Sequence, residues 1–301
     1  MMVFRTLTQL RYFGLGCSLL LVAASIFSIN HYGLKLGIDF TGGIIIDVSI
    51  QTLATAAELQ AQLSGSIGQW VTITADATPG IWQLALPATS AITDPQQIIS
   101  LLAQQLNLPV DLLQATVIGP QIGEELYHQG GLALLVASLS IMLYLTMRFE
   151  WRLSFAAITS LIHDTILTLG LLAFLEVEMD LNVVAGLLAV IGYSLNDSIV
   201  IADRLRDVLR AKPDTNIFTS TDIAVSATFT RTLITAGTTL FTIGCLLLLG
   251  GEALYGFSIT LFAGVVTGTW SSVTIASTVQ ELLGLHPQHY QSKPDLIDDL
   301  P

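Results

Sequence analysis

The sequence predicts an α-helical membrane protein that crosses the bilayer six times and carries one folded domain outside it. Only 11% of the 301 residues are charged and 52% are hydrophobic, whereas about 25% of an ordinary soluble protein is charged. In addition, six apolar stretches are each close to the roughly 20 residues that a helix needs to cross a ~30 Å hydrocarbon core. These stretches are 12–29, 130–147, 153–175, 181–202, 233–249 and 256–279.

The composition also argues against several other classes of protein. A water-soluble enzyme of this size needs more charge to cover its surface, and a disordered chain has a lower apolar content. The net charge of −12 argues against a nucleic-acid partner, which requires clustered Lys and Arg. Because Cys17 and Cys245 both lie within apolar stretches, we expect neither a disulfide framework nor a metal site.

The basic residues indicate how the spans are oriented. Of the eleven Lys and Arg residues, only Lys35 lies on the same side as the long loop that follows the first span. Since basic residues are enriched in cytoplasmic loops, we expect both termini in the cytoplasm. The first stretch is long, and the six-span pattern requires it, so we interpret it as an uncleaved signal-anchor rather than a signal peptide.

These spans divide the chain into four parts. They are the N-terminus with the first helix (1–29), an extracytoplasmic domain (30–129), a five-helix bundle (130–280) and a cytoplasmic tail (281–301).

The segment 30–129 alternates between strand and helix patterns. We expect strands at 43–50, 70–75, 81–86 and 112–118, and helices at 52–63 and 95–106. Thr52 and Asp94 are the expected N-caps of the two helices. The order β-α-β-β-α-β is that of a ferredoxin-like α+β domain. The segment contains no His/Cys cluster and no nucleophile motif, so we expect a binding or mechanical module.

A few polar residues stand out within the apolar stretches. His163 and Asp164 lie near the centre of the third stretch, Asn196 and Asp197 lie in the fourth, and Arg231 immediately precedes the fifth. A charge at mid-bilayer costs about 2.5–3.5 kcal/mol, so such residues usually face the interior of a bundle and have a function.

Helix geometry places these residues at graded depths. Asp164 is expected about 16 Å and Asp197 about 8 Å from the cytoplasmic ends of their helices, with Arg231 at the boundary. Burial favours a protonated carboxyl and a nearby Arg favours an ionised one, so a change in their separation would load and unload a proton. A proton moving inward releases about 2.3 kcal/mol per 100 mV. We therefore expect a proton relay.

Two other interpretations of these residues stay open. His163, Asn196 and Asp197 can be hydrogen-bonding groups between helices, each worth about 1 kcal/mol. An intramembrane aspartyl protease would need two carboxylates that share a proton at ~3 Å. The expected depths of Asp164 and Asp197 differ by about 8 Å, and no Gly-x-Gly-Asp motif surrounds Asp197, which disfavours the protease.

Two motifs resemble those of a known family. Gly37-Ile-Asp-Phe-Thr-Gly-Gly43 resembles the signature shared by SecD and SecF, accessory proteins of bacterial Sec export. Ile191-Gly-Tyr-Ser-Leu-Asn-Asp-Ser-Ile-Val200 resembles the fourth span of SecF, and Leu161–Asp164 and Arg231–Thr235 resemble further SecF segments. The resemblance covers nearly the whole chain, and the small outer domain favours the SecF family over SecD.

The resemblance implies a subunit of the Sec preprotein translocase. SecF-like proteins pair with SecD into a twelve-span unit of the RND superfamily, which uses the proton-motive force in late steps of export on the outer side of the membrane. The implied partners are SecD, the SecYEG channel, the ATPase SecA, translocating preproteins and membrane lipid, with YajC and YidC as further candidates. The resemblance implies no cofactor, no metal and no enzymatic activity of the chain itself.

The resemblance also assigns roles to single residues. Asp197 matches the membrane carboxylate of the family and Arg231 its proton-coupling arginine; Asp164, His163 and Asn196 complete the expected relay. The first motif is expected to be structural, with Asp39 as a local hydrogen-bond acceptor and glycines for tight backbone geometry. Its residues are Gly37, Asp39, Phe40, Thr41, Gly42 and Gly43. Ser226-Ala227-Thr228 departs from the Asn-Gln/Glu-Thr run of the family, so the local polar network is expected to differ.

Other functions share the same fold. A stand-alone RND-type exporter of lipids or small molecules would have the same spans, and a structural scaffold would only stabilise SecD. The sequence is compatible with coupling to either H⁺ or Na⁺. It is also compatible with a location in either the plasma membrane or a thylakoid membrane.

Overall fold

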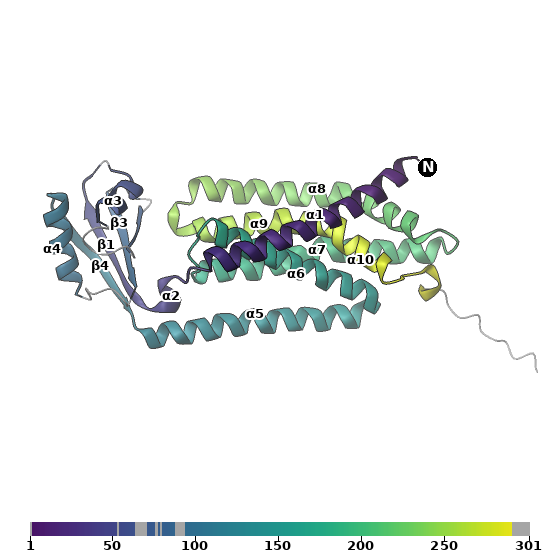
Figure 1. The fold of residues 1–301 in the computed structure, drawn as a ribbon, viewed down its shortest axis with the longest axis horizontal. Helices are drawn as coiled ribbons and strands as arrows, with labels where there is room; N and C mark the ends of the chain where they lie inside the picture. The colour runs from purple at the N-terminus through teal and green to yellow at the C-terminus, as the bar shows by residue number, and fades with distance from the viewer. Residues whose placement is uncertain are drawn as a thin grey trace, which may run out of the picture.

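The computed structural model describes residues 2–52, 54–63, 71–75, 78, 80–87 and 94–290. They form a long helical bundle with a small sheet domain at one end (Figure 1). The N-terminus lies at the opposite end of the bundle. We refer to these as the sheet end and the terminal end.

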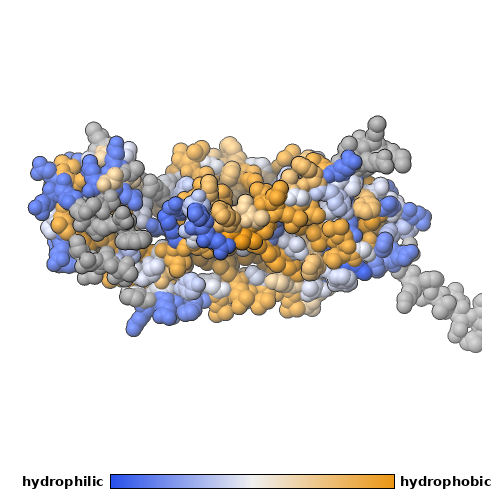
Figure 2. Space-filling view, in the orientation of Figure 1, coloured by the Kyte–Doolittle hydropathy of each residue, from blue (hydrophilic) through white to orange (hydrophobic). Residues whose placement is uncertain are grey.

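The bundle consists of six membrane-length helical segments, which confirms the six predicted spans. Its helices are α1 (Met2–Tyr32), α5 (Pro120–Arg148), α6 (Trp151–Phe174), α7 (Leu181–Ala211), α8 (Ile217–Leu249) and α9 (Tyr255–Ser271). The last of these continues through a π-helical turn, Ser272–Ala276, into α10 (Ser277–Leu282). Apolar side chains dominate much of the outer surface of the bundle (Figure 2), as a lipid environment requires.

The helices are longer than the apolar stretches that predicted them, because an apolar stretch marks only the part that crosses hydrocarbon. The largest difference is in α8, which was expected from residue 233 and begins at Ile217, where the side chain of Asn216 accepts a hydrogen bond from the Phe218 amide at 3.2 Å. Similarly, α5 begins at Pro120, inside the expected outer domain, since Pro suits the first turn of a helix.

The sheet domain has the predicted β-α-β-β-α-β order. Its strands are antiparallel and lie in the order β2-β3-β1-β4, which is the ferredoxin-like arrangement. The elements are β1 (Gly43–Ile50), α3 (Ala56–Leu63), β2 (Thr72–Ala75), β3 (Ile81–Pro87), α4 (Pro95–Leu106) and β4 (Val110–Ile118). Alternate residues of β1 and β3, such as Ile46 and Leu84, pack with Leu59 of α3 and with Ile98 and Leu102 of α4.

The caps of the two short helices differ in how well the sequence predicted them. Asp94 caps α4 by accepting a hydrogen bond from the Gln96 amide at 3.0 Å, as predicted. The prediction that Thr52 caps the first helix is wrong. Thr55 and Glu58 cap α3 reciprocally, and these hydrogen bonds hold the pKa of Glu58 below its ordinary value. The expected strand start at Trp70 lies outside the described residues.

A buried cluster of charges joins three helices near the terminal end. The guanidinium of Arg11, which is fully buried, contacts Asp222 of α8 and Glu281 of α10, each at 2.8 Å. Thr8 donates to Asp222 at 2.5 Å and Tyr12 to Glu281 at 3.2 Å. Arg11 therefore lies inside α1 and ties that helix to α8 and α10.

Replacing Arg11 tests whether this cluster holds the bundle together. Arg11→Met leaves two buried carboxylates without a counter-charge, so we expect the protein to lose about 3–5 kcal/mol of stability. Arg148→Met is the matched control, because its contact with Asp203 at 3.7 Å is 44% exposed on both sides and such pairs contribute about 0–1 kcal/mol. Denaturant unfolding of the purified protein in detergent measures both; equal losses would contradict the assignment.

The start of β1 depends on a glycine. A Cβ atom at Gly43 would lie 2.2 Å from the carbonyl oxygen of Leu86 on β3, which is well inside a van der Waals contact. We expect Gly43→Ala to separate the two strands and to destabilise the sheet domain by about 1–3 kcal/mol. Gly131→Ala, at a position with open space, should be neutral. Hydrogen exchange of the β1 amides measures the difference, and unchanged protection in Gly43→Ala would refute it.

Candidate functional site

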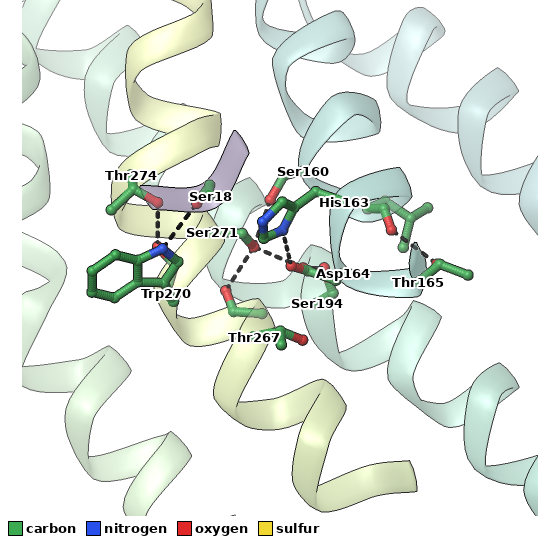
Figure 3. Close-up of polar contacts among 12 residues, drawn as sticks. Ser18, Ser160, His163, Asp164, Thr165, Ser194, Thr267, Trp270, Ser271 and Thr274 are labelled. Carbon is green, nitrogen blue, oxygen red and sulfur yellow. Dashed lines mark hydrogen bonds and ion pairs between the residues drawn. The ribbon is translucent and has the colours of Figure 1, made fainter. Parts of the chain in front are cut away.

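Asp164 is fully buried where α6, α7 and α9 meet (Figure 3). One carboxylate oxygen lies 2.9 Å from Nδ1 of His163. The other accepts hydrogen bonds from the hydroxyls of Ser194 on α7 at 2.5 Å and of Ser271 on α9 at 2.7 Å. Ser160 in turn donates to Ser271 at 2.8 Å. One carboxylate therefore joins three membrane helices.

Small residues bring the three helices close enough for this network. A Cβ atom at Gly264 of α9 would lie 2.1 Å from Val190 of α7, so a larger residue would separate the two helices. One turn further along α9, a Cβ atom at Gly268 would lie 3.6 Å from the Asp164 carboxylate. The sequence therefore provides a carboxylate on one helix and short side chains on the two helices that face it.

The two ring nitrogens of His163 have different surroundings. Its Nδ1 faces Asp164, whereas its Nε2 is buried and has no hydrogen-bond partner among the described residues. A neutral imidazole has one N–H donor and one acceptor nitrogen, so a ring that donates through Nδ1 exposes an acceptor at Nε2. This geometry suits a side chain that takes up a proton and passes it to or from Asp164.

Asp197 is also buried but has a different environment. Thr232 of α8 contacts its carboxylate as a hydrogen-bond partner, and Arg231 is near enough for its charge to act on it. The second carboxylate oxygen has no hydrogen-bond partner among the described residues. Among the ion pairs of the described chain, none joins Asp197 to Arg231.

The two carboxylates lie closer in depth than the expected 8 Å. Ser194, which bonds to Asp164, precedes Asp197 by three residues on α7, so only about 4.5 Å of helix rise separates the two levels. The expected depths were measured from the predicted ends of the two helices, and the observed ends lie elsewhere. In the described chain no hydrogen bond links Asp164 to Asp197. The two residues therefore do not have the geometry of an aspartyl protease, in which two carboxylates share one proton.

Arg231 and Asn196 lie outside the interior of the bundle. Arg231, which was expected at the membrane boundary, lies about four turns into α8, because this helix begins at Ile217, before the apolar stretch that starts at residue 233. Both side chains are exposed on the surface of the bundle. The structure thus brings His163 to Asp164, and Arg231 and Thr232 to Asp197, but it does not bring all the expected relay residues into one bonded chain.

Ser194, Ser271 and Ser160 are the site residues that sequence reasoning missed. Ser194 lies inside the quoted motif at 191–200, so its position was visible, but hydroxyls are common in membrane helices and did not stand out. Only the packing of α6 against α7 and α9 identifies these serines as partners of one carboxylate.

The Gly37–Gly43 motif forms the turn where the chain leaves α1 and enters the sheet. The amide of Gly37 donates to the carbonyl of Met179 at 2.8 Å. The carboxylate of Asp39 accepts from the amide of Leu181, at the start of α7, at 3.0 Å. The expectation that Asp39 is a local acceptor is therefore wrong, since its partner is 142 residues away.

The rest of the motif packs against α5. Phe40 is buried in the short helix α2 (Ile38–Thr41), and its ring makes an edge-to-face contact with Tyr127 at 6.1 Å. Thr41 donates to the carbonyl of Gly37 at 3.1 Å, and Gly42 adopts φ +72°, which favours glycine. A Cβ atom at Gly123 of α5 would lie 2.8 Å from the Phe40 carbonyl oxygen. The motif is thus a joint between the sheet and the bundle.

A second carboxylate lies beside Asp39 at the start of α7. Asp180 caps this helix by accepting from the Val183 amide at 2.7 Å. Burial raises the pKa of Asp180 above its ordinary value and the charge of Asp39 adds to this, while the Val183 and Asn182 hydrogen bonds oppose it. In the part of the chain that the structure describes, no group of three or more His, Cys, Asp and Glu residues could hold a metal ion.

Two family models match the chain. The C-terminal region of the protein export membrane proteins SecD and SecF matches residues 99–285, and the SecD/SecF GG motif matches residues 27–52. The second match contains the joint formed by the Gly37–Gly43 motif.

Similar proteins align with most of the length of this chain. The chain is 38% identical to the protein translocase subunit SecF of Vibrio alginolyticus, covering 90% of this chain and 87% of that one. It is 36% identical to SecF of Pseudomonas aeruginosa, covering 97% and 96%. SecF of Escherichia coli O157:H7 is also 36% identical, covering 92% and 87%.

Solved structures have the same fold. The crystal structure of SecDF from Thermus thermophilus, a translocon-associated membrane protein, matches with a TM-score of 0.79 and 29% identity. A SecDF structure in a super-membrane-facing form matches with a TM-score of 0.69. The chain spans 38% of the length of each SecDF chain and 92% and 91% of its own. These matches and the six-span architecture show that the chain belongs to the SecF family of multi-pass membrane proteins.

Proposed function

We propose that this chain is the SecF subunit of a Sec translocase, and that with SecD it couples the proton-motive force to late steps of protein export. The observation that carries the proposal is the site of Asp164. Its carboxylate is fully buried in the middle of a membrane-spanning helix and accepts hydrogen bonds from two other helices. No Lys or Arg pairs with it among the described ion pairs. A carboxylate in such a position is costly and is typical of proton relays.

The proton state of Asp164 determines which helix contacts are possible. An ionised carboxylate only accepts hydrogen bonds, and it receives those of His163, Ser194 and Ser271 together. A protonated carboxyl also donates one, and Nδ1 of His163 or a serine hydroxyl can accept it. Because hydrogen bonds to an ionised carboxylate are about twice as strong as those to a neutral carboxyl, protonation would weaken the contacts of α7 and α9 with α6. The incoming proton reaches Nε2 of His163, and the proton on Nδ1 passes to Asp164. Asp197, with Arg231 nearby, is the second proton site.

Exposed polar groups support SecD as the membrane partner. Asn196 is exposed within the apolar stretch of α7, and Arg231 is exposed at the edge of the apolar stretch of α8. Lipid tails cannot hydrogen-bond these groups, so a second protein has to cover them. A SecD subunit on this face would do so, and the similarity to SecDF chains supports this pairing. A stand-alone exporter would leave both side chains in lipid.

The orientation and the remaining partners belong to the same proposal. Leaving aside Arg11, which is buried in α1, and Arg231, which lies about four turns into α8, eight of the other nine basic residues lie on the side of the termini. This asymmetry supports cytoplasmic termini in the inner membrane and a sheet domain on the outer side. The translocase subunits among the relatives support SecYEG, SecA and preproteins as partners. The proposal that YajC and YidC are further partners rests on the family resemblance alone.

Asp197→Asn tests the coupling directly. Inverted membrane vesicles that contain the channel, SecA, SecD and this chain translocate a preprotein with and without an imposed proton gradient. We expect Asp197→Asn to assemble with SecD at the wild-type level but to lose the gradient-dependent increment of translocation, because an amide cannot ionise. A variant that keeps the full increment would refute a role of Asp197 in coupling.

Asp164→Asn tests the site that carries the proposal. The amide oxygen still accepts hydrogen bonds from the serines, but the group cannot ionise, so we expect at least a tenfold loss of the gradient-dependent increment. Ser160→Ala is the matched control, since Ser160 bonds to Ser271 and not to the carboxylate, and it should keep most of the increment. Equal behaviour of the two variants would mean that Asp164 only joins helices.

A further inference from the structure

We propose that the turn between α6 and α7, residues 175–180, is the mechanical linkage that carries the proton state of the bundle to the outer sheet domain. The inference rests on the proposed function and deepens it, because it identifies the path between the buried carboxylates and the part that would act on the exported chain. We refer to this segment as the α6–α7 turn.

Backbone hydrogen bonds join the α6–α7 turn to the chain that leaves α1. Leu36 and Met179 form a parallel β-bridge. The amide of Gly37 donates to the carbonyl of Met179 at 2.8 Å, and the amide of Met179 donates to the carbonyl of Lys35 at 2.7 Å. The turn and the start of the Gly37–Gly43 motif are therefore paired like two strands of one sheet, and a displacement of one displaces the other.

Side chains strengthen this connection on both sides. Asp39 of the motif accepts from the amide of Leu181, which starts α7. Lys35 forms an ion pair with Glu176. On the other side, the hydroxyl of Thr72 in β2 donates to the carboxylate of Glu178 at 2.5 Å. The α6–α7 turn thus contacts the sheet domain through both the motif and a strand of the sheet.

The same two helices carry the proton site. Asp164 lies on α6, about three turns before the α6–α7 turn, and its partner Ser194 lies on α7, about four turns after it. A change in the bond between Asp164 and Ser194 shifts α6 against α7. Because both helices are continuous up to the turn, the shift reaches it without an intervening flexible segment.

The α6–α7 turn has a fixed shape, as a linkage requires. Glu176 adopts φ +55°, a left-handed conformation that side chains other than Gly, Asn and Asp seldom adopt. Its amide donates to the carbonyl of Ala173 and the amide of Val177 to that of Leu172, which closes the end of α6. Met179 is buried. The turn is therefore held by backbone bonds at both ends.

The connection between the sheet and the bundle through α5 is weaker. A cavity of about 590 Å³ lies between the face of the sheet and the bundle, lined in part by Thr74, Gln83 and Tyr255. The strand β4 leads into α5, but only 6% of the apolar window of α5 is buried, against 50% for α6 and for α7. Since α5 is loosely packed on the bundle, motion of α6 and α7 reaches the sheet through the α6–α7 turn.

Two matched pairs of variants test the linkage in the vesicle assay with SecD. Asp39→Ala removes the acceptor for the Leu181 amide, whereas Asp39→Asn keeps an acceptor oxygen. Glu178→Ala removes the acceptor for Thr72, whereas Glu178→Gln keeps it; this position is exposed, so folding should not depend on it. We expect each Ala variant to reduce the gradient-dependent increment at least threefold, with assembly and gradient-independent translocation within twofold of wild type. The conservative variants should keep at least half of the increment.

A reversible cross-link provides a readout that a purely structural role would not change. Adjacent strands lie about 4.8 Å apart, which a disulfide can bridge, so Leu36→Cys with Met179→Cys should close the bridge when Cys17 and Cys245 are replaced by Ala. Oxidation should restore the increment to Asp39→Ala, and reduction should remove it again. Failure of the oxidised form to regain the increment would overturn the linkage.

Asp197→Asn in the same vesicles separates the two proposals. If Asp197→Asn loses the increment while Asp39→Ala and Glu178→Ala keep it, the linkage is overturned and the coupling function stands. If Asp197→Asn keeps the increment while the two Ala variants lose it, Asp197 is not a coupling site and the α6–α7 turn still transmits. Retention of the increment by all three variants overturns the linkage and the coupling role of Asp197, and the proposed function then depends on the result for Asp164→Asn.

Discussion

The constraint on which this structure depends is that a carboxylate inside a membrane needs every hydrogen bond that its surroundings can supply. Asp164 accepts a hydrogen bond from a serine on each of the two helices that face α6. A single ionisable group therefore contacts three spans and fixes how they pack. Glycines at 264 and 268 let α9 approach closely enough for this to happen. On the proposed function, proton binding at this carboxylate would therefore change the packing of three helices.

The bundle uses buried charge in two different ways. Near the terminal end, Arg11 neutralises Asp222 and Glu281 and holds three helices together with a compensated cluster. In the middle, Asp164 and Asp197 form no ion pair with an Arg or Lys in the described chain, and His163 leaves one nitrogen without a partner. A compensated cluster resists change because neither partner can leave without cost. The centre of the bundle, in contrast, is where a single proton can alter the contacts.

The contacts of the Gly37–Gly43 motif at the sheet end explain why it contains these residues. Its glycines allow a backbone turn that touches α5, while Asp39 and the amide of Gly37 reach the chain between α6 and α7. The motif that identifies the family thus lies where the sheet domain joins the helices that carry Asp164 and Ser194. A fold that converts proton movement into movement of an outer domain needs such a joint to be stiff, and two backbone hydrogen bonds make it so.

The sequence by itself determined the six spans, the order of the outer domain and the family, because hydropathy, strand alternation and short motifs are local properties of neighbouring residues. Tertiary structure decided the rest. Ser194 and Ser271 are partners of Asp164, Arg11 forms a buried cluster with Asp222 and Glu281, and Asp39 accepts a hydrogen bond from an amide 142 residues away. The start of α8 at Ile217, well before its apolar stretch, was also not visible from the apolar pattern. Each of these depends on contacts between distant segments, which only the packing of the helices brings together.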